Sequence, residues 1–239
     1  MQYLTLVPYF IILAGVGLSY VGMLPAMKGW MLSELGVLSG LGLAIAIAFT
    51  GRSDLLWAAA FAVLPSMIAI PKVIRDLRYP RINDVATNVE HPPAFVAAPQ
   101  AAPNTGRDMS FPEKNGPIIR EAYPNVRPLI LDKPLEQSFQ RIETLARIQP
   151  GWVITRRDAK THTLEGEATT SFFRFVDDFI IHVSDQEGEA LINMRSKSRD
   201  GLVDAGANAK RIQRFFEQLA KFKETGGAPH VEGYANTHV

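Results

Sequence analysis

The sequence of 239 residues contains no cysteine. Disulfide bonds, thiolate catalysis and cysteine-ligated zinc or iron–sulfur centres are therefore excluded. Neither sign of charge is in excess, since 25 Lys and Arg residues stand against 24 Asp and Glu residues. Such a chain has no overall basic field to attract nucleic acid. The charge balance therefore predicts no nucleic-acid partner. The histidines lack metal-ligand spacing, so we also expect no metal and no cofactor. They stand at positions 91, 162, 182, 230 and 239.

Charge is also missing from the first 26 residues. Residues 3–21 form an apolar run of the length that a helix needs to cross hydrocarbon, about 20 residues. A signal peptide would start with basic residues and have a shorter apolar core, so we interpret this run as a membrane span. Two more apolar runs cover residues 35–51 and 55–70, and the third predicted helix extends over residues 55–74. The sequence therefore predicts three transmembrane helices within residues 1–75, with the lipid bilayer as partner.

The second apolar run is rich in small residues, which allow helices to approach closely; they include Gly36, Gly40, Gly42 and Ala44. The tight connector at residues 51–54 predicts that the second and third spans form a hairpin. The third run is short and contains Pro65, so a re-entrant segment is the alternative to a third span.

Basic residues follow the third run closely, namely Lys72, Arg75, Arg78 and Arg81. The positive-inside rule would place this end, and the remainder of the chain, in the cytoplasm. Arg52 in the opposite loop is a weaker signal of the same kind.

Proline is frequent over residues 76–128, and it fixes the backbone and removes hydrogen-bond donors. This stretch is expected to be an extended linker that crosses the next domain. Residues 129–225 show clear periodicity instead and are predicted to form a soluble domain. Residues 226–239 are expected to be a flexible tail.

The order of elements predicted for residues 129–225 is strand, helix, four strands, helix. The first helix begins after Pro134, and the last runs over residues 204–223 with Asp204 as its N-cap. Such an order predicts an α+β fold, in which an antiparallel sheet carries two helices on one face in a helix-grip-like layout.

The hairpin near residue 187 allows a prediction of strand register. With a two-residue tip at residues 186–187, Phe179 lies opposite Met194 on an apolar face. Asp178 then lies opposite Arg195 on the other face, and an opposite-charge pair of this kind contributes roughly 0.2–1 kcal/mol.

Polar side chains of the kinds that bind anions or transfer protons are concentrated in two stretches near this hairpin. As candidate binding residues we select Asp177, Asp178, Arg195, Ser196, Ser198, Arg199, Asp204, Asn208 and Arg211. The alternative interpretation of these residues is an Asp–Arg structural network together with a helix cap. No phosphate loop, nucleophile elbow or zinc signature accompanies them.

These stretches resemble domain-of-unknown-function family 1499. Three motifs match those of the family. They are the paired aspartates at residues 177–178, the Arg-Ser-x-Ser-Arg-x-Gly pattern at 195–201 and the Asp-x-Gly-x-Asn-x-x-Arg-Ile pattern at 204–212. Upstream, residues 81–88 and 91–95 resemble the start of the family's three-span members. The resemblance covers residues 79–223 and implies no established activity. It does imply a domain outside the cytoplasm, so we favour a bacterial inner-membrane protein with a periplasmic domain, against the count of basic residues.

Three functions remain open. The domain is expected to bind a lipid-like or small apolar ligand, or a membrane-protein partner, with aromatic residues lining the site: Phe172, Phe173, Phe175 and Phe179. The first alternative is an assembly or scaffolding subunit of a membrane complex. The second is a hydrolase-type enzyme, which would require at least two carboxylates converging in an open cleft. The catalytic groups of such an enzyme would be Asp177, Asp178 and Asp204 with Arg195 and Arg199. Binding or scaffolding is favoured over catalysis.

Overall fold

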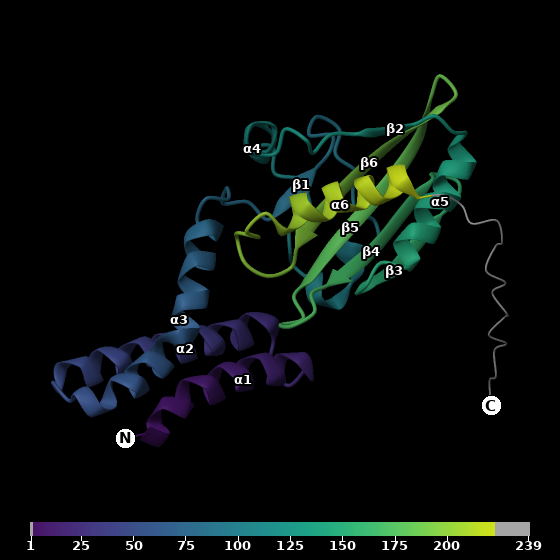
Figure 1. Ribbon diagram of the computed structural model, residues 1–239. Coiled ribbons are helices and arrows are strands. Elements are labelled where there is room, and N and C mark those ends of the chain that lie inside the picture. Colours follow the sequence, from purple (N-terminus) through teal and green to yellow (C-terminus); the bar gives the residue numbers. More distant parts are fainter. Residues whose placement is uncertain (1, 223–239) are drawn as a thin grey trace, which may run out of the picture.

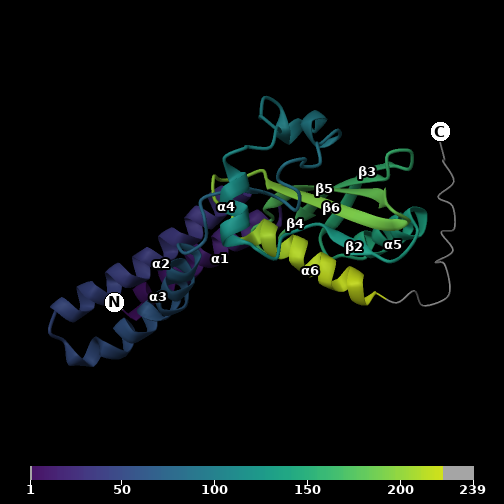
Figure 2. The ribbon, with the colours of Figure 1, turned by 90° about the horizontal axis from the view of Figure 1, so that it is seen from above.

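The computed structural model describes residues 2–222, and the predicted tail at 226–239 lies outside them. The chain has two parts, a bundle of three helices and a domain built on one sheet (Figure 1). The third helix leads directly into the domain, so both parts are joined at one end of the bundle (Figures 1 and 2).

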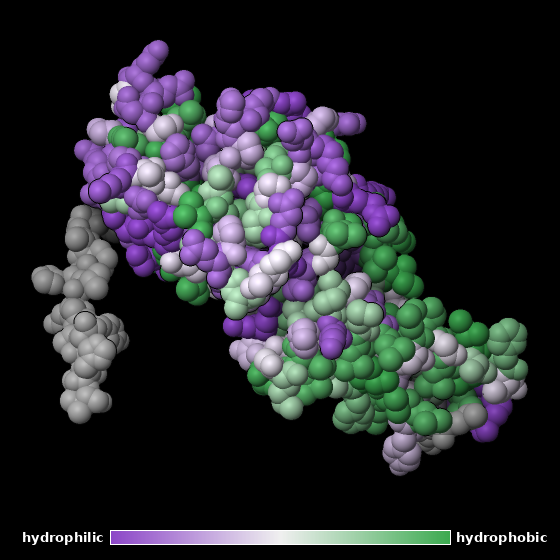
Figure 3. Space-filling view, turned by 180° about the vertical axis from the view of Figure 1, so that it is seen from behind, coloured by the Kyte–Doolittle hydropathy of each residue, from purple (hydrophilic) through white to green (hydrophobic). Residues whose placement is uncertain are grey.

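The bundle contains α1 (Val7–Tyr20), α2 (Ala26–Phe49) and α3 (Leu56–Asp76), with 3-10 turns before α1 and α3. These three helical segments are long and apolar enough to cross a membrane. The bundle is covered by hydrophobic side chains, whereas hydrophilic ones prevail on the domain (Figure 3). The second candidate span begins at Ala26, earlier than the predicted residue 35, and its first half includes Lys28 and Glu34. Helix α3 is continuous through Pro65.

Small residues bring the helices of the bundle together, as predicted for α2. A Cβ on Gly36 would stand 2.7 Å from Ile12 Cγ1, and a Cβ on Gly40 would overlap the carbonyl oxygen of Ala62. Gly42 differs, because nothing lies within 4 Å of its Cβ position. Hydroxyl groups add bonds between helices: Tyr9 donates to the Phe61 carbonyl at 2.6 Å.

The domain is built on a six-stranded antiparallel sheet with the order β1-β6-β5-β4-β3, in which the short β2 also pairs with β6. Its strands are β1 (Asp84–Ala86), β2 (Leu129–Leu131), β3 (Trp152–Asp158), β4 (Thr163–Thr169), β5 (Val176–Gln186) and β6 (Glu189–Ser198). Helices α5 (Leu135–Arg147) and α6 (Ala207–Lys221) pack on one face of the sheet, and α4 (Asn115–Ala122) lies beside β1 (Figure 1).

The main core fills the space between the sheet and these two helices. Phe139 and Ile142 of α5, Ile212 of α6 and Phe179 of β5 are fully buried there. The periodicity that predicted these helices thus reflects burial of one helix face. The predicted fold class, membrane-type helices followed by an antiparallel sheet with helices on one face, is confirmed.

The predicted register of the hairpin is wrong by two residues. Phe179 pairs with Ser196 and Asp178 with Lys197, so Asp178 does not face Arg195. The tip is formed by Glu187 and Gly188, both with positive φ. A two-residue turn of this type needs positive φ at both positions, which favours glycine at the second. Because side chains alternate with a period of two, the shift leaves every residue on its predicted face.

The proline-rich stretch at 76–128 is not simply a linker, and the domain begins before residue 129. It supplies β1, α4 and a covering segment (residues 88–113) that lies on the sheet face opposite α5 and α6 (Figure 2). Phe95, Ala98 and Met109 of this segment bury Ile180 of β5. Proline disfavours long regular elements but does not prevent burial, so the composition alone could not reveal this packing.

Candidate functional site

The nine candidate residues do not form one site, because adjacent residues of a strand point to opposite faces of the sheet. Asp178, Arg195 and Arg199 lie on the face beneath the covering segment. The others lie on the helix side, near the start of α6: Asp177, Ser196, Ser198, Asp204, Asn208 and Arg211.

Arg195 is the largest fully buried side chain, with 1% of its surface exposed. Its guanidinium donates to both carboxylate oxygens of Asp84, at 2.9 Å from Nε and 2.8 Å from Nη2. The Lys197 ammonium reaches the same carboxylate at 2.9 Å. Buried charges of this kind are stable only when they are paired and hydrogen-bonded. Asp84 therefore joins β1 to β6 through two cations.

A second buried cluster lies on the same face around Arg199. Its guanidinium contacts Asp178 at 2.6 Å and Glu167 at 2.5 Å. Burial lowers the pKa of Arg199, but these two carboxylates outweigh burial and hold it above its ordinary value. Asn104 of the covering segment donates to Asp178 at 2.9 Å, so the segment closes over this cluster.

Two further charged side chains join the covering segment to the sheet through backbone groups. The carboxylate of Glu165, which is buried in β4, accepts hydrogen bonds from the amides of Val96, Ala97 and Ala98 at 2.9–3.2 Å. Arg107 donates to the carbonyls of Ser198 and Arg199. In these clusters the carboxylates at positions 84, 165, 167 and 178 are thus equal in number to the cations at positions 107, 195, 197 and 199.

The helix-side group fixes α6 to the end of the sheet. Arg211 forms an ion pair with Asp177 and donates to Ser196 Oγ at 2.9 Å. Asn208 is fully buried, and its side chain accepts from Ser196 and donates to Ser198. Each group has several partners within the domain, which is the pattern of a structural network.

The predicted N-cap is wrong, because Gly206 holds that position and α6 begins at Ala207. Asp204 nevertheless accepts hydrogen bonds at the start of the helix. Its carboxylate accepts from the amides of Gly206 at 2.8 Å and Asn208 at 3.0 Å. Burial is the largest influence on this carboxyl group and raises its pKa above the ordinary value, against these hydrogen bonds.

The two adjacent aspartates do not converge as the hydrolase alternative would require. Asp177 and Asp178 point to opposite faces, and each is held by its own arginine. Across residues 2–222, no group of three or more His, Asp and Glu side chains is placed to hold a metal ion.

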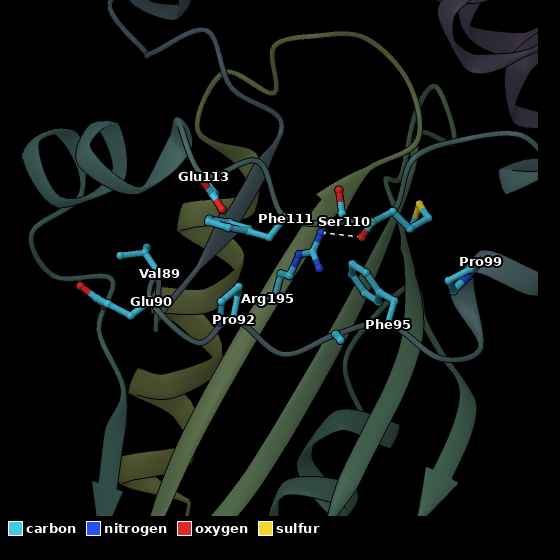
Figure 4. A pocket seen from close by; sticks show the side chains of 11 residues that line it. Val89, Glu90, Pro92, Phe95, Pro99, Ser110, Phe111, Glu113 and Arg195 are labelled. Carbon is cyan, nitrogen blue, oxygen red and sulfur yellow. Dashed lines mark hydrogen bonds between the residues drawn. The ribbon is translucent and has the colours of Figure 1, made fainter.

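The covering segment encloses a groove of about 500 Å³ (Figure 4). Arg195 is the only residue of the sheet among its lining residues. The guanidinium lies between two aromatic rings, 4.6 Å from the centroid of Phe95 and 5.4 Å from that of Phe111. Apolar residues form most of the wall: Val89, Pro92, Ala94, Phe95, Pro99, Met109 and Phe111. Glu90, Ser110 and Glu113 complete it.

The aromatic residues predicted to line an apolar site do not do so. Phe179 is buried in the core, where its ring lies 4.2 Å from that of Trp152. Phe172 instead points outward, with 70% of its surface exposed. The groove therefore lies on the opposite face from the one expected.

The model of a family described as a protein of unknown function, DUF1499, matches residues 84–219. The chain belongs to the DUF1499 family. The match begins at β1 and ends within α6, so the DUF1499 domain includes the covering segment and both polar groups and leaves out the bundle. No curated protein matches the chain.

Several important residues of the DUF1499 domain were not among the candidates. The clusters beneath the covering segment are completed by six such residues: Asp84, Glu165, Glu167, Lys197, Asn104 and Arg107. Asp84 and Phe95 lie within the upstream segments that resemble the family. That resemblance was the available signal, since their distance along the sequence gives no hint of contact with β6.

Proposed function

We propose that this DUF1499 protein is a membrane-anchored binding protein whose groove holds a small apolar, lipid-like ligand. The observation that supports this most directly is the groove itself. Its volume of about 500 Å³ falls in the range of small-molecule sites, roughly 300–1,000 Å³, and such sites have mainly apolar walls with few polar groups. A buried ligand would replace water against Phe95, Phe111 and the two prolines.

The charges of the groove favour a neutral ligand, or one with a cationic group. Arg195 is paired with Asp84, and its aromatic neighbours enclose it. The acidic side chains at the edge, Glu90 and Glu113, oppose a carboxylate or phosphate. Glu90 is paired with Arg120, which leaves Glu113 as the carboxylate for a ligand cation.

We place the bundle in a bacterial inner membrane and the domain in the periplasm. The apolar helices support the membrane, and the family resemblance supports the outer side. The basic residues after α3 oppose this placement, so topology is tested separately below.

The full chain purified from membranes provides the test of ligand binding. Ala94 lines the groove and is exposed, so Ala94→Trp fills the groove without burying a new group in the core. Ala102→Trp adds the same ring to an exposed position of the covering segment outside the lining residues. Mass spectrometry of extracted small molecules then compares both variants with the wild type, and the bundle retains the same surrounding lipid in all three.

We expect one apolar species that the wild type and Ala102→Trp retain at equal amounts and that Ala94→Trp loses at least tenfold. Equal retention by all three would show that the groove is not the binding site. Bilayer lipid alone in all three would contradict ligand binding and favour the scaffolding alternative.

A further inference from the structure

Two loops at one end of the sheet expose large apolar side chains. Residues 170–175 join β4 to β5, and residues 199–206 join β6 to α6. Phe172 in the first loop is 70% exposed and Leu202 in the second is 81% exposed. A single exposed apolar residue is ordinary on a soluble domain, but two such tips at one end of one sheet need an explanation.

Both loops are held in shape by hydrogen bonds. The amide of Thr170 donates to the Phe175 carbonyl at 2.9 Å, and the amide of Phe175 donates to Thr170 Oγ1 at 2.9 Å. In the second loop, Asn83 donates to the Gly201 carbonyl at 2.6 Å. The apolar tips are therefore presented outward by fixed backbones, so ordering them on a surface costs little further entropy.

This end of the sheet is the end nearest the helical bundle. Figures 1 and 2 show that the start of β5 and the end of β6 point toward the bundle, whereas the β5–β6 hairpin tip points away. A Cβ on Gly201 would stand 3.4 Å from Met27 Cε, and Met27 lies in the first turn of α2. The end of an apolar span lies at the level of the lipid headgroups.

Three basic side chains are exposed at the same end of the molecule, although the second loop itself also carries Asp200 and Asp204. Lys28 near the start of α2, Arg78 just after α3 and Arg174 in the first loop are exposed at this end. Aromatic and aliphatic side chains flanked by Lys and Arg form the usual pattern of a surface that rests in the membrane interface, with cations at the level of anionic headgroups.

We propose that Phe172 and Leu202 insert into the interfacial region of the bilayer next to the bundle, and that the surrounding basic residues contact anionic headgroups. The domain then has a second membrane contact besides α3, which fixes its orientation over the lipid surface. The proposal rests on the membrane placement of the bundle but not on ligand binding in the groove.

The absence of native cysteine allows a direct test in the full chain, reconstituted into vesicles with 30% anionic phospholipid. Single-cysteine variants Phe172→Cys and Leu202→Cys each carry one environment-sensitive fluorophore. Ile130→Cys is the matched control, because Ile130 is also apolar and 48% exposed but lies on β2, which pairs with β6 near the hairpin tip. Gln186→Cys at that tip is the polar control.

Lipids with a nitroxide near the headgroup should quench the labels at positions 172 and 202 at least threefold more strongly than those at 130 and 186. Iodide in the aqueous phase should show the reverse order. Equal accessibility to iodide at all four positions would overturn the proposal, as would protection of 172 and 202 from both quenchers, which indicates a protein partner or a second copy.

Partition of each variant into the vesicles is measured in the same samples. Loss of the chain from the vesicles would overturn the membrane placement of the bundle, and with it this proposal. The groove test with Ala94→Trp has a different readout, so failure of ligand binding is distinguished from failure of membrane contact.

Discussion

Asp84 has the most demanding position of any single residue in the domain. It is fully buried, and two cations, Arg195 and Lys197, depend on one carboxylate. Two positive charges close together in a low-dielectric interior are costly without an opposing charge. Arginine also suits this place better than lysine would, because its planar guanidinium bonds both oxygens of Asp84 while its faces contact two rings.

Asp84→Ala is therefore expected to destabilise the domain strongly. Removing one partner of a buried ion pair typically costs about 3–5 kcal/mol. Arg147→Ala removes an exposed partner of Glu143 and serves as control, with an expected loss below about 1 kcal/mol. Thermal unfolding of the full chain in detergent, followed by near-ultraviolet circular dichroism, measures both. A change of Asp84→Ala no larger than that of Arg147→Ala would contradict the structural role of the cluster.

Asp204 makes stability depend on pH. Burial raises its pKa in the folded domain, so the folded state binds this proton more tightly than the unfolded state, whose pKa is about 3.9. Stability from this group is therefore fully present below the unfolded pKa and is lost as the pH rises through the folded pKa. Asp204→Asn removes the titration and retains an oxygen that can accept the amide hydrogen bonds.

Compared with Asp204→Asn, the wild type should lose stability as the pH rises above about 4. Chemical unfolding of both proteins at several pH values between 4 and 7 measures the difference. Parallel stability curves over this interval would show that the carboxyl group titrates equally in the folded and unfolded states.

At the residue scale, the sequence showed which residue types matter but not which of them meet. Asp177 and Asp178 are adjacent in sequence, and their separation by the sheet follows from strand alternation alone. Asp84 and Arg195 are far apart in sequence, and only the pairing of β1 with β6 brings them together. Local patterns cannot predict such contacts, because a short strand such as β1 carries no periodic signal.

Among the secondary-structure elements, long periodic ones were predicted well. Helices α5 and α6 bury the predicted face, and β3 alternates in burial as expected. Strands β4 to β6 occur where they were predicted but are buried on both faces over much of their length, because the covering segment lies on the second face. The covering segment was missed as part of the domain because its burial comes from backbone amides bound to Glu165 and from isolated side chains. Neither produces a repeat in the sequence.

The glycines of α2 provide a test at the level of helix packing. Gly40→Ala places a methyl group against the Ala62 carbonyl of α3, whereas Gly42→Ala meets no neighbouring atom. We expect Gly40→Ala to weaken the packing of α2 against α3 by about 1–3 kcal/mol, the usual cost of overpacking. Gly42→Ala is expected to be neutral or slightly stabilising. Unfolding of the full chain by increasing mole fraction of a denaturing detergent compares the two, and equal stability would contradict the packing.

At the scale of the whole molecule, the bundle and the domain are joined by a short connection. Residue 76 ends α3 and residue 84 begins β1, so the domain is connected to the bundle by few residues. Contact of the two loops with the bilayer would restrain rotation of the domain about this connection.

The side of the membrane on which the domain lies is the last expectation to test. Three spans require that the domain and the connector between α2 and α3 lie on opposite sides. Single-cysteine variants Gln186→Cys, in the hairpin tip, and Ser53→Cys, in the connector, are both exposed and report the two sides. A membrane-impermeant maleimide added to intact bacterial cells is expected to label Gln186→Cys and to leave Ser53→Cys unmodified until the cells are lysed.

The reverse labelling would place the domain in the cytoplasm, where the basic residues after α3 would follow the positive-inside rule. Labelling of both positions from the same side would contradict three spans, whichever side it is. The periplasmic placement therefore depends on an experiment in which resemblance to the family and the distribution of charge give opposite predictions. Only labelling at position 186 with protection at position 53 agrees with the prediction from the family resemblance.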